Sequence, residues 1–81
     1  MSEKCQSIIM EIIENSLELS PGTLKVDSCS EDIENWDSLG QLTILVALDK
    51  NFAGKVSGLS EMAEANSVQK IIQILHDNSL C

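Results

Sequence analysis

A chain of 81 residues has room for one domain with a modest core, because a domain of this size buries only about 60% of its unfolded surface. Its 13 acidic and 5 basic residues give a formal net charge of −8, which disfavours nucleic acid and favours partners with basic patches. No apolar run could span a bilayer, no secretory signal opens the chain, and the three cysteines form no CxxC pair. We therefore expect one cytoplasmic domain over residues 1–81, without membrane insertion and with reduced thiols.

The first predicted helix spans residues 5–17. Its apolar residues recur at alternating intervals of three and four, which is the spacing of a single helical face. Three glutamates are expected to face outward from it: Glu11, Glu14 and Glu18. The run Ser20-Pro21-Gly22 is predicted to end the helix, since proline disfavours helical conformation in the residue before it.

A long connection over residues 19–37 follows, which exceeds the usual 2–8 residues between helices of a bundle. Its apolar residues have neither helical nor strand period and are expected to pin the loop over the core: Leu19, Leu24, Val26, Ile33 and Trp36. Five acidic residues occupy its second half: Asp27, Glu31, Asp32, Glu34 and Asp37. They lack the central glycine and final glutamate of a calcium-binding EF-hand loop, so no metal site is predicted beyond weak divalent-ion binding.

The second predicted helix starts at a cap, Asp37 or Ser38, and runs to about Phe52. At about 100° per residue it carries two apolar stripes. Four residues form a normal core face: Ile44, Leu45, Leu48 and Phe52. Three others form a separate stripe, which Asp49 divides from the first: Leu39, Leu42 and Val46. We expect the second stripe to be exposed for partner docking; the alternative is that the loop and a later short helix cover it.

The remaining chain predicts a connection over residues 54–58, a short helix over Ser60–Glu64 and a last helix capped by Asn66 or Ser67. Four apolar residues of that last helix have core spacing: Val68, Ile71, Ile72 and Leu75. The predicted fold is therefore all-α. It is a small four-helix bundle of three longer helices and one short helix, with a long loop between the first and second helices.

Ser38 stands where the long loop meets the second predicted helix, so its hydroxyl is expected to be accessible to another enzyme. Unpaired amides and the positive end of the helix would stabilise a phosphate attached there. A serine at such a position is also a common helix cap. No Ser-His-acid set is present to make it a catalytic nucleophile. From the residues alone, a modification site and a simple cap both stay open.

The segment Trp36-Asp37-Ser38-Leu39-Gly40-Gln41-Leu42 resembles the phosphopantetheine attachment segment of acyl carrier proteins. The resemblance continues through Leu45, Ala47-Leu48-Asp49 and Phe52, and Ser67-Val68-Gln69 is similar to the opening of the family's final helix. It implies that a 4'-phosphopantetheine arm from coenzyme A is attached covalently to Ser38 by a magnesium-dependent phosphopantetheinyl transferase. Asp37 and Leu39 would complete the attachment motif.

The same resemblance implies how such a protein works. The thiol of the arm would hold an acyl group as a thioester, and the carrier itself would catalyse nothing. Acyl-transferring, ligating or synthase enzymes would contact Leu39, Leu42, Val46 and Asp49, and the carrier would be a monomer. Three residues are expected to line a cavity for the acyl chain: Met62, Ala65 and Ile71.

Two departures from carriers of primary fatty-acid biosynthesis shape the expected pathway. Those carriers have several acids along the second helix, whereas this chain has Asp49 together with Thr43 and Lys50. The presence of Trp36 before the Asp37-Ser38-Leu39 segment is similar to the pattern in discrete carriers of specialised lipid, polysaccharide or secondary-metabolite pathways. We therefore expect this chain to serve a specialised pathway of that kind. Two alternatives stay open: an aminoacyl or peptidyl carrier, and an unmodified helical interaction module in which Ser38 is only a cap.

Overall fold

The computed structural model describes residues 3–56 and 58–80. Within these residues the chain forms three α-helices and two 3-10 helices, and no strand: α1 (Glu3–Ser16), η1 (Ser30–Asp32), α2 (Ser38–Asn51), η2 (Ser60–Glu64) and α3 (Val68–Asp77). The all-α prediction is confirmed, and the predicted short helix is present as η2. The element η1 was not predicted. Ser57 of the predicted connection and Cys81 lie outside the described residues.

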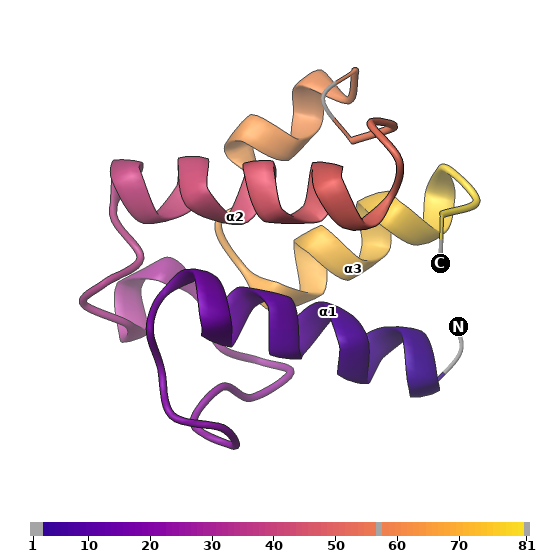
Figure 1. Ribbon diagram of the computed structural model, residues 1–81. Helices are drawn as coiled ribbons and strands as arrows, with labels where there is room; N and C mark the ends of the chain where they lie inside the picture. The colour runs from indigo at the N-terminus through magenta and orange to yellow at the C-terminus, as the bar shows by residue number, and fades with distance from the viewer. Residues whose placement is uncertain (1–2, 57, 81) are drawn as a thin grey trace.

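The helices form a compact arrangement in which α1 and α2 run in opposite directions (Figure 1). α1 packs against α2 and α3, and η2 packs against the same two helices. α1 begins and α3 ends on one side of the molecule, whereas α2 begins on the other side (Figure 1). The start of α2, which carries Ser38, is therefore remote from both ends of the described chain.

The core draws on every α-helix, on η2 and on the connection before it. Nine large side chains are fully buried: Ile9, Ile13, Ile44, Leu48, Val56, Met62, Val68, Ile71 and Leu75. The helices contribute them at the predicted intervals of three and four, because a helix that packs on one side buries a single stripe. Leu45 and Phe52 of the predicted core face of α2 are only half-buried.

The long loop is held against this core as expected. Leu24 and Trp36 are buried, and Leu19 and Ile33 are half-buried and pack against the core. Val26 is exposed, so its predicted role in pinning the loop is wrong. An isolated antiparallel bridge also joins the loop to the segment before α3: Ser30 N–H donates to the Asn66 carbonyl at 2.8 Å, and Val68 N–H donates to the Ser28 carbonyl at 3.0 Å.

Two expectations about α1 are wrong. Glu14 does not face outward but is buried, because its Oε2 accepts hydrogen bonds from the loop amides of Gly22 at 2.9 Å and Leu24 at 3.0 Å. The helix ends at Ser16, one residue before the predicted end, but the Ser20-Pro21-Gly22 run is not the signal that ends it. Glu18 adopts a left-handed conformation with φ of 57°, and this residue turns the chain before the proline is reached.

The cysteines and the helix lengths bear on the expected environment. Cys5 is disulfide-bonded, so the prediction of reduced thiols is wrong for this residue. Cys29 is a free thiol that is half-buried and donates to Asp32 Oδ2 at 3.3 Å. None of the helices in the described residues combines the length and the apolar character needed to cross a bilayer.

Candidate functional site

Ser38 is the first residue of α2, and the helix cap is its neighbour Asp37. The Asp37 carboxylate accepts a hydrogen bond from the Gly40 amide at 2.9 Å, which satisfies one of the unpaired N–H groups of the first turn. Ser38 is exposed, and its hydroxyl makes no hydrogen bond to any described residue. The open question of which residue caps α2 is therefore answered, and the Ser38 hydroxyl is left accessible.

The first turn of α2 sits very close to the end of α1 and the loop. A Cβ added to Gly40 would collide with the Asn35 carbonyl oxygen and lie 2.9 Å from Cδ2 of Leu17. The Asn35 side-chain amide donates to the Leu17 carbonyl at 2.9 Å. Only glycine allows this approach, so Gly40 helps to fix the position of the turn that carries Ser38. The sequence pattern had placed Gly40 in the segment Trp36–Leu42 without assigning it a role of its own.

Trp36 and Gln41 form a hydrogen-bonded bridge that sequence reasoning missed. The buried Trp36 indole N–H donates to Gln41 Oε1 at 2.6 Å. The Gln41 amide nitrogen donates in turn to the carbonyls of Met62 at 3.0 Å and Ala65 at 2.9 Å. The bridge joins the loop, α2 and the η2 segment. A tryptophan and a glutamine five residues apart have no periodic signature, so only the packed structure identifies it.

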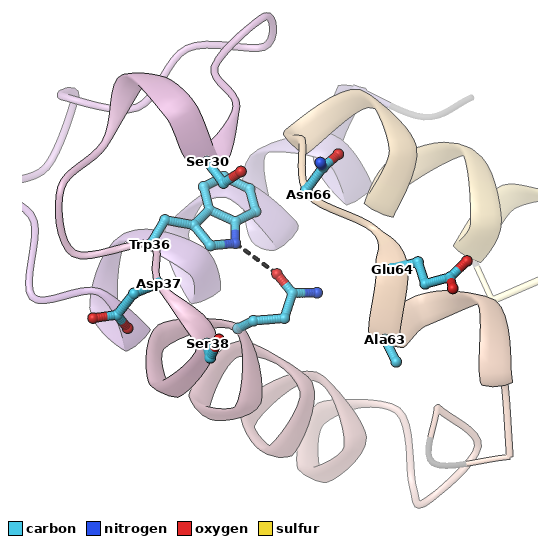
Figure 2. Close-up of a pocket in the computed structure, with 8 residues that line it drawn as sticks. Ser30, Trp36, Asp37, Ser38, Ala63, Glu64 and Asn66 are labelled. Atoms are coloured by element: carbon cyan, nitrogen blue, oxygen red, sulfur yellow. Dashed lines mark hydrogen bonds between the residues drawn. The ribbon is translucent and has the colours of Figure 1, made fainter.

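A hollow of about 520 Å³ opens beside Ser38 (Figure 2). Eight residues line it, most of them polar: Ser30, Trp36, Asp37, Ser38, Gln41, Ala63, Glu64 and Asn66. Ser30, Trp36 and Ser38 lie on one side of the hollow, and Ala63, Glu64 and Asn66 lie on the other (Figure 2). The Asp37 carboxylate points away from it (Figure 2). An extended polar group attached to Ser38 would therefore have a recess next to its point of attachment.

The second apolar stripe of α2 lies at the surface. Leu39 is 72% exposed, Leu42 is 57% exposed and Val46 is 48% exposed, whereas Ile44 and Leu48 are fully buried. The alternative that the loop and the short helix cover this stripe is therefore wrong. Asp49 is half-buried. Large apolar side chains exposed on one helical face are typical of an interaction surface.

A second, mostly apolar groove of about 410 Å³ runs between α2 and η2. Its lining residues come from both elements and from the connection between them: Leu42, Leu45, Val46, Asp49, Lys50, Val56, Leu59, Ser60, Met62 and Ala63. Of the three residues expected to line an acyl-chain cavity, Met62 lines this groove. Met62, Ala65 and Ile71 are all packed in the core.

This end of the molecule thus combines an accessible hydroxyl at the start of a helix, a polar hollow and an exposed apolar stripe. No group of three or more His, Cys, Asp or Glu side chains among residues 3–56 and 58–80 is placed to hold a metal ion. Comparisons of the chain with family models, with curated proteins and with solved structures find no match.

Proposed function

We propose that this chain is an acyl carrier protein whose Ser38 bears a covalent 4'-phosphopantetheine arm. The observation that supports this most directly is that the residue capping α2 and the residue proposed to be modified are two different side chains. Asp37 caps the helix, so the exposed Ser38 hydroxyl is not used in the fold. A serine kept only as a cap would use its own oxygen as the acceptor.

The proposed modification suits the chemistry of this position. The Ser38 oxygen would attack the phosphate of coenzyme A that carries the pantetheine, form a phosphodiester and displace adenosine 3',5'-bisphosphate. The transferase would supply the magnesium ion and accept the serine proton. The positive end of α2 would stabilise the negative charge of the product, which the opposite end of a helix would not do.

In this proposal the carrier catalyses no reaction. It holds an acyl group as a thioester on the arm and raises its effective concentration at each partner enzyme. The exposed stripe of Leu39, Leu42 and Val46, with Asp49 beside it, would contact those enzymes. The net charge of −8 would favour partners with basic patches and disfavour nucleic acid.

The same proposal includes the type of helical bundle, the location of the protein in the cell, its oligomeric state and its pathway. η2 would be the short helix of the four-helix bundle typical of acyl carriers. The protein would act as a cytoplasmic monomer in a specialised lipid, polysaccharide or secondary-metabolite pathway. Lys50 and Thr43 on α2 support such a role, because both stand among positions where carriers of primary fatty-acid biosynthesis have several acids.

The test is incubation of the purified chain with coenzyme A, magnesium and a broad-specificity phosphopantetheinyl transferase, followed by intact mass spectrometry. We expect a mass increase of one phosphopantetheinyl group. Ser38→Ala should abolish the increase, whereas Ser60→Ala, at the exposed first position of η2, should not. Peptide mapping of the modified protein should place the arm on Ser38.

Two results of this test would each favour a different function for the chain. A wild-type mass that stays at the unmodified value would favour a helical interaction module in which Ser38 has no covalent role. A modified chain that is loaded only by an amino-acid-activating or aryl-activating enzyme would favour an aminoacyl or peptidyl carrier.

A further inference from the structure

The polar hollow beside Ser38 is lined by side chains whose hydrogen-bonding groups are not used within the fold. Ser30 is half-buried there, and its hydroxyl makes no hydrogen bond to any described residue. The Asn66 side chain uses its oxygen to accept from Lys70 Nζ at 3.3 Å, and its nitrogen donates to none of the described residues. A hydroxyl and an amide donor are therefore available to a ligand next to the proposed attachment site.

The two sides of this hollow are held together by hydrogen bonds. The Ser30 amide donates to the Asn66 carbonyl at 2.8 Å, which fixes the backbones of these two residues side by side. Gln41 accepts from the Trp36 indole at 2.6 Å and donates to the Ala65 carbonyl at 2.9 Å, so it joins the loop to the end of η2. A ligand in the hollow would meet groups that are already in place, which lowers the entropic cost of binding.

The group that the proposed modification attaches to Ser38 has the chemistry that this lining requires. A phosphopantetheine arm contains two amides, each with an N–H donor and a carbonyl acceptor. In the hollow the Asn66 nitrogen can donate to an arm carbonyl, and the Ser30 hydroxyl can accept from an arm N–H. Trp36 and Ala63 provide apolar lining for the two methyl groups of the arm. In the mostly apolar groove between α2 and η2 the arm amides would lose water and find few polar partners.

We infer that the polar hollow is a binding site for the phosphopantetheine arm itself, in which Ser30 and Asn66 form hydrogen bonds with the arm amides. This inference depends on the proposed function, and it adds that the arm of the free carrier is held against the protein. The covalent attachment supports such binding, because a short flexible tether gives the arm a local concentration in roughly the millimolar range. Few hydrogen bonds are then needed for the arm to occupy the site in most molecules.

The experiment attaches the arm from coenzyme A that is isotope-labelled at the nitrogens of both pantetheine amides and measures their motion by NMR relaxation. In the wild-type protein both arm amides should have order parameters above about 0.6, since flexible groups lie below this value. Nuclear Overhauser effects should connect the arm methyl groups with the indole of Trp36, the only tryptophan of the chain. In the double variant Ser30→Ala, Asn66→Ala both order parameters should fall below about 0.6, and these Overhauser effects should be lost.

Two control variants make the result specific. Lys70→Ala removes the hydrogen bond to Asn66 Oδ1 but leaves the Asn66 nitrogen in place, so it should behave as wild type. Ser7→Ala changes an exposed serine of α1 that does not line the hollow, and it should also behave as wild type. Circular dichroism of each variant confirms that the fold is kept. If the double variant does not fold, Ser30→Ala alone provides the comparison and should lower the order parameter of the amide that bonds to Ser30.

The outcomes separate this inference from the proposed function. A wild-type chain that gains no mass from the labelled coenzyme A would contradict the proposed function, and this inference with it. An attached arm whose amides have order parameters below about 0.6 in the wild-type protein would overturn only the binding site. Overhauser effects from the arm to Val56 or Leu59 would also overturn it, because the arm would then lie in the apolar groove. Order parameters that stay at the wild-type values in the double variant would overturn it as well, since Ser30 and Asn66 would then not hold the arm.

Discussion

Glu14 shows how a single side chain fixes the path of the long loop. Its Oε2 accepts hydrogen bonds from the amides of Gly22 and Leu24, and the second of these places the buried Leu24 side chain against the core. A buried amide without an acceptor is costly, so a loop that folds back over α1 needs such a partner. The carboxylate therefore acts as a structural acceptor on the face that periodicity assigned to solvent.

We predict that Glu14→Ala lowers the free energy of unfolding by about 2 kcal/mol, because two amides lose a charged acceptor. Glu14→Gln keeps an oxygen at this position and should cost less. Urea denaturation followed by circular dichroism measures both. Glu11→Ala, at an exposed position of the same helix, should change stability by less than about 0.5 kcal/mol. Similar losses at Glu11 and Glu14 would contradict the assigned role.

The residues that sequence reasoning identified correctly are those with a periodic or positional signature. The exposure of Leu39, Leu42 and Val46 follows from two stripes on one short helix, and the location of Ser38 at the start of α2 follows from a loop that precedes a periodic run. Gln41 and Gly40 could not be predicted in the same way. Their importance depends on atoms distant in sequence, the Met62 carbonyl and the Leu17 side chain, which only the folded chain brings near.

At the scale of elements, all three α-helices end in the same way. Each is followed by a left-handed residue that is not glycine: Glu18, Ala53 and Ser79, with φ of 57°, 57° and 60°. The next amide then bonds five residues back, from Leu19 to Glu14, from Gly54 to Asp49 and from Leu80 to Leu75, each at 2.8 Å. This is the Schellman arrangement, in which glycine is the usual left-handed residue. Because the left-handed residue after α1 is Glu18 and not glycine, the sequence pattern pointed to Ser20-Pro21-Gly22 as the signal that ends this helix.

We predict that Ala53→Gly stabilises the protein by about 0.5–1 kcal/mol, because glycine adopts positive φ without the steric cost that alanine carries. The expected rise in melting temperature is about 4 °C for a domain of this size. Ala47→Gly within α2 is the matched control and should lower stability by about 1 kcal/mol. An Ala53→Gly variant that melts below wild type would show that glycine's greater freedom in the unfolded chain outweighs relief of this conformation.

The elements themselves were predictable to different extents. The α-helices and η2 carry local signals, in the form of periodic apolar residues and the Ser67 cap, whose side chain accepts from the Lys70 amide. η1 carries none that is comparable. Its first residue, Ser30, donates its amide to the carbonyl of Asn66, so this segment is held by a contact across 36 positions of the chain. Local sequence patterns do not encode such a pairing.

At the scale of the whole molecule, charge is distributed unevenly relative to the proposed attachment site. Five acidic residues lie between Asp27 and Asp37, in the loop that leads directly into Ser38. Asp77 lies at the end of α3, and Figure 1 shows this end on the side of the molecule opposite the start of α2. A basic partner that approaches Ser38 would therefore meet the loop acids first, and its association rate should depend on them.

We predict that kcat/KM for modification of Ser38 by a transferase with a basic binding surface falls about tenfold when salt is raised from about 0.05 M to about 0.5 M, since screening shortens the range of charge attraction. Glu34→Gln should lower the low-salt value several-fold and weaken the salt dependence. Asp77→Asn removes the same charge from the opposite side and should do neither, although both positions are exposed. Equal effects of the two substitutions would mean that net charge, and not the acids of the loop, guides the partner. A rate that does not change with salt would show that electrostatic attraction does not contribute to recognition of Ser38 by the partner. The exposed stripe of Leu39, Leu42 and Val46 would then be the main source of that recognition.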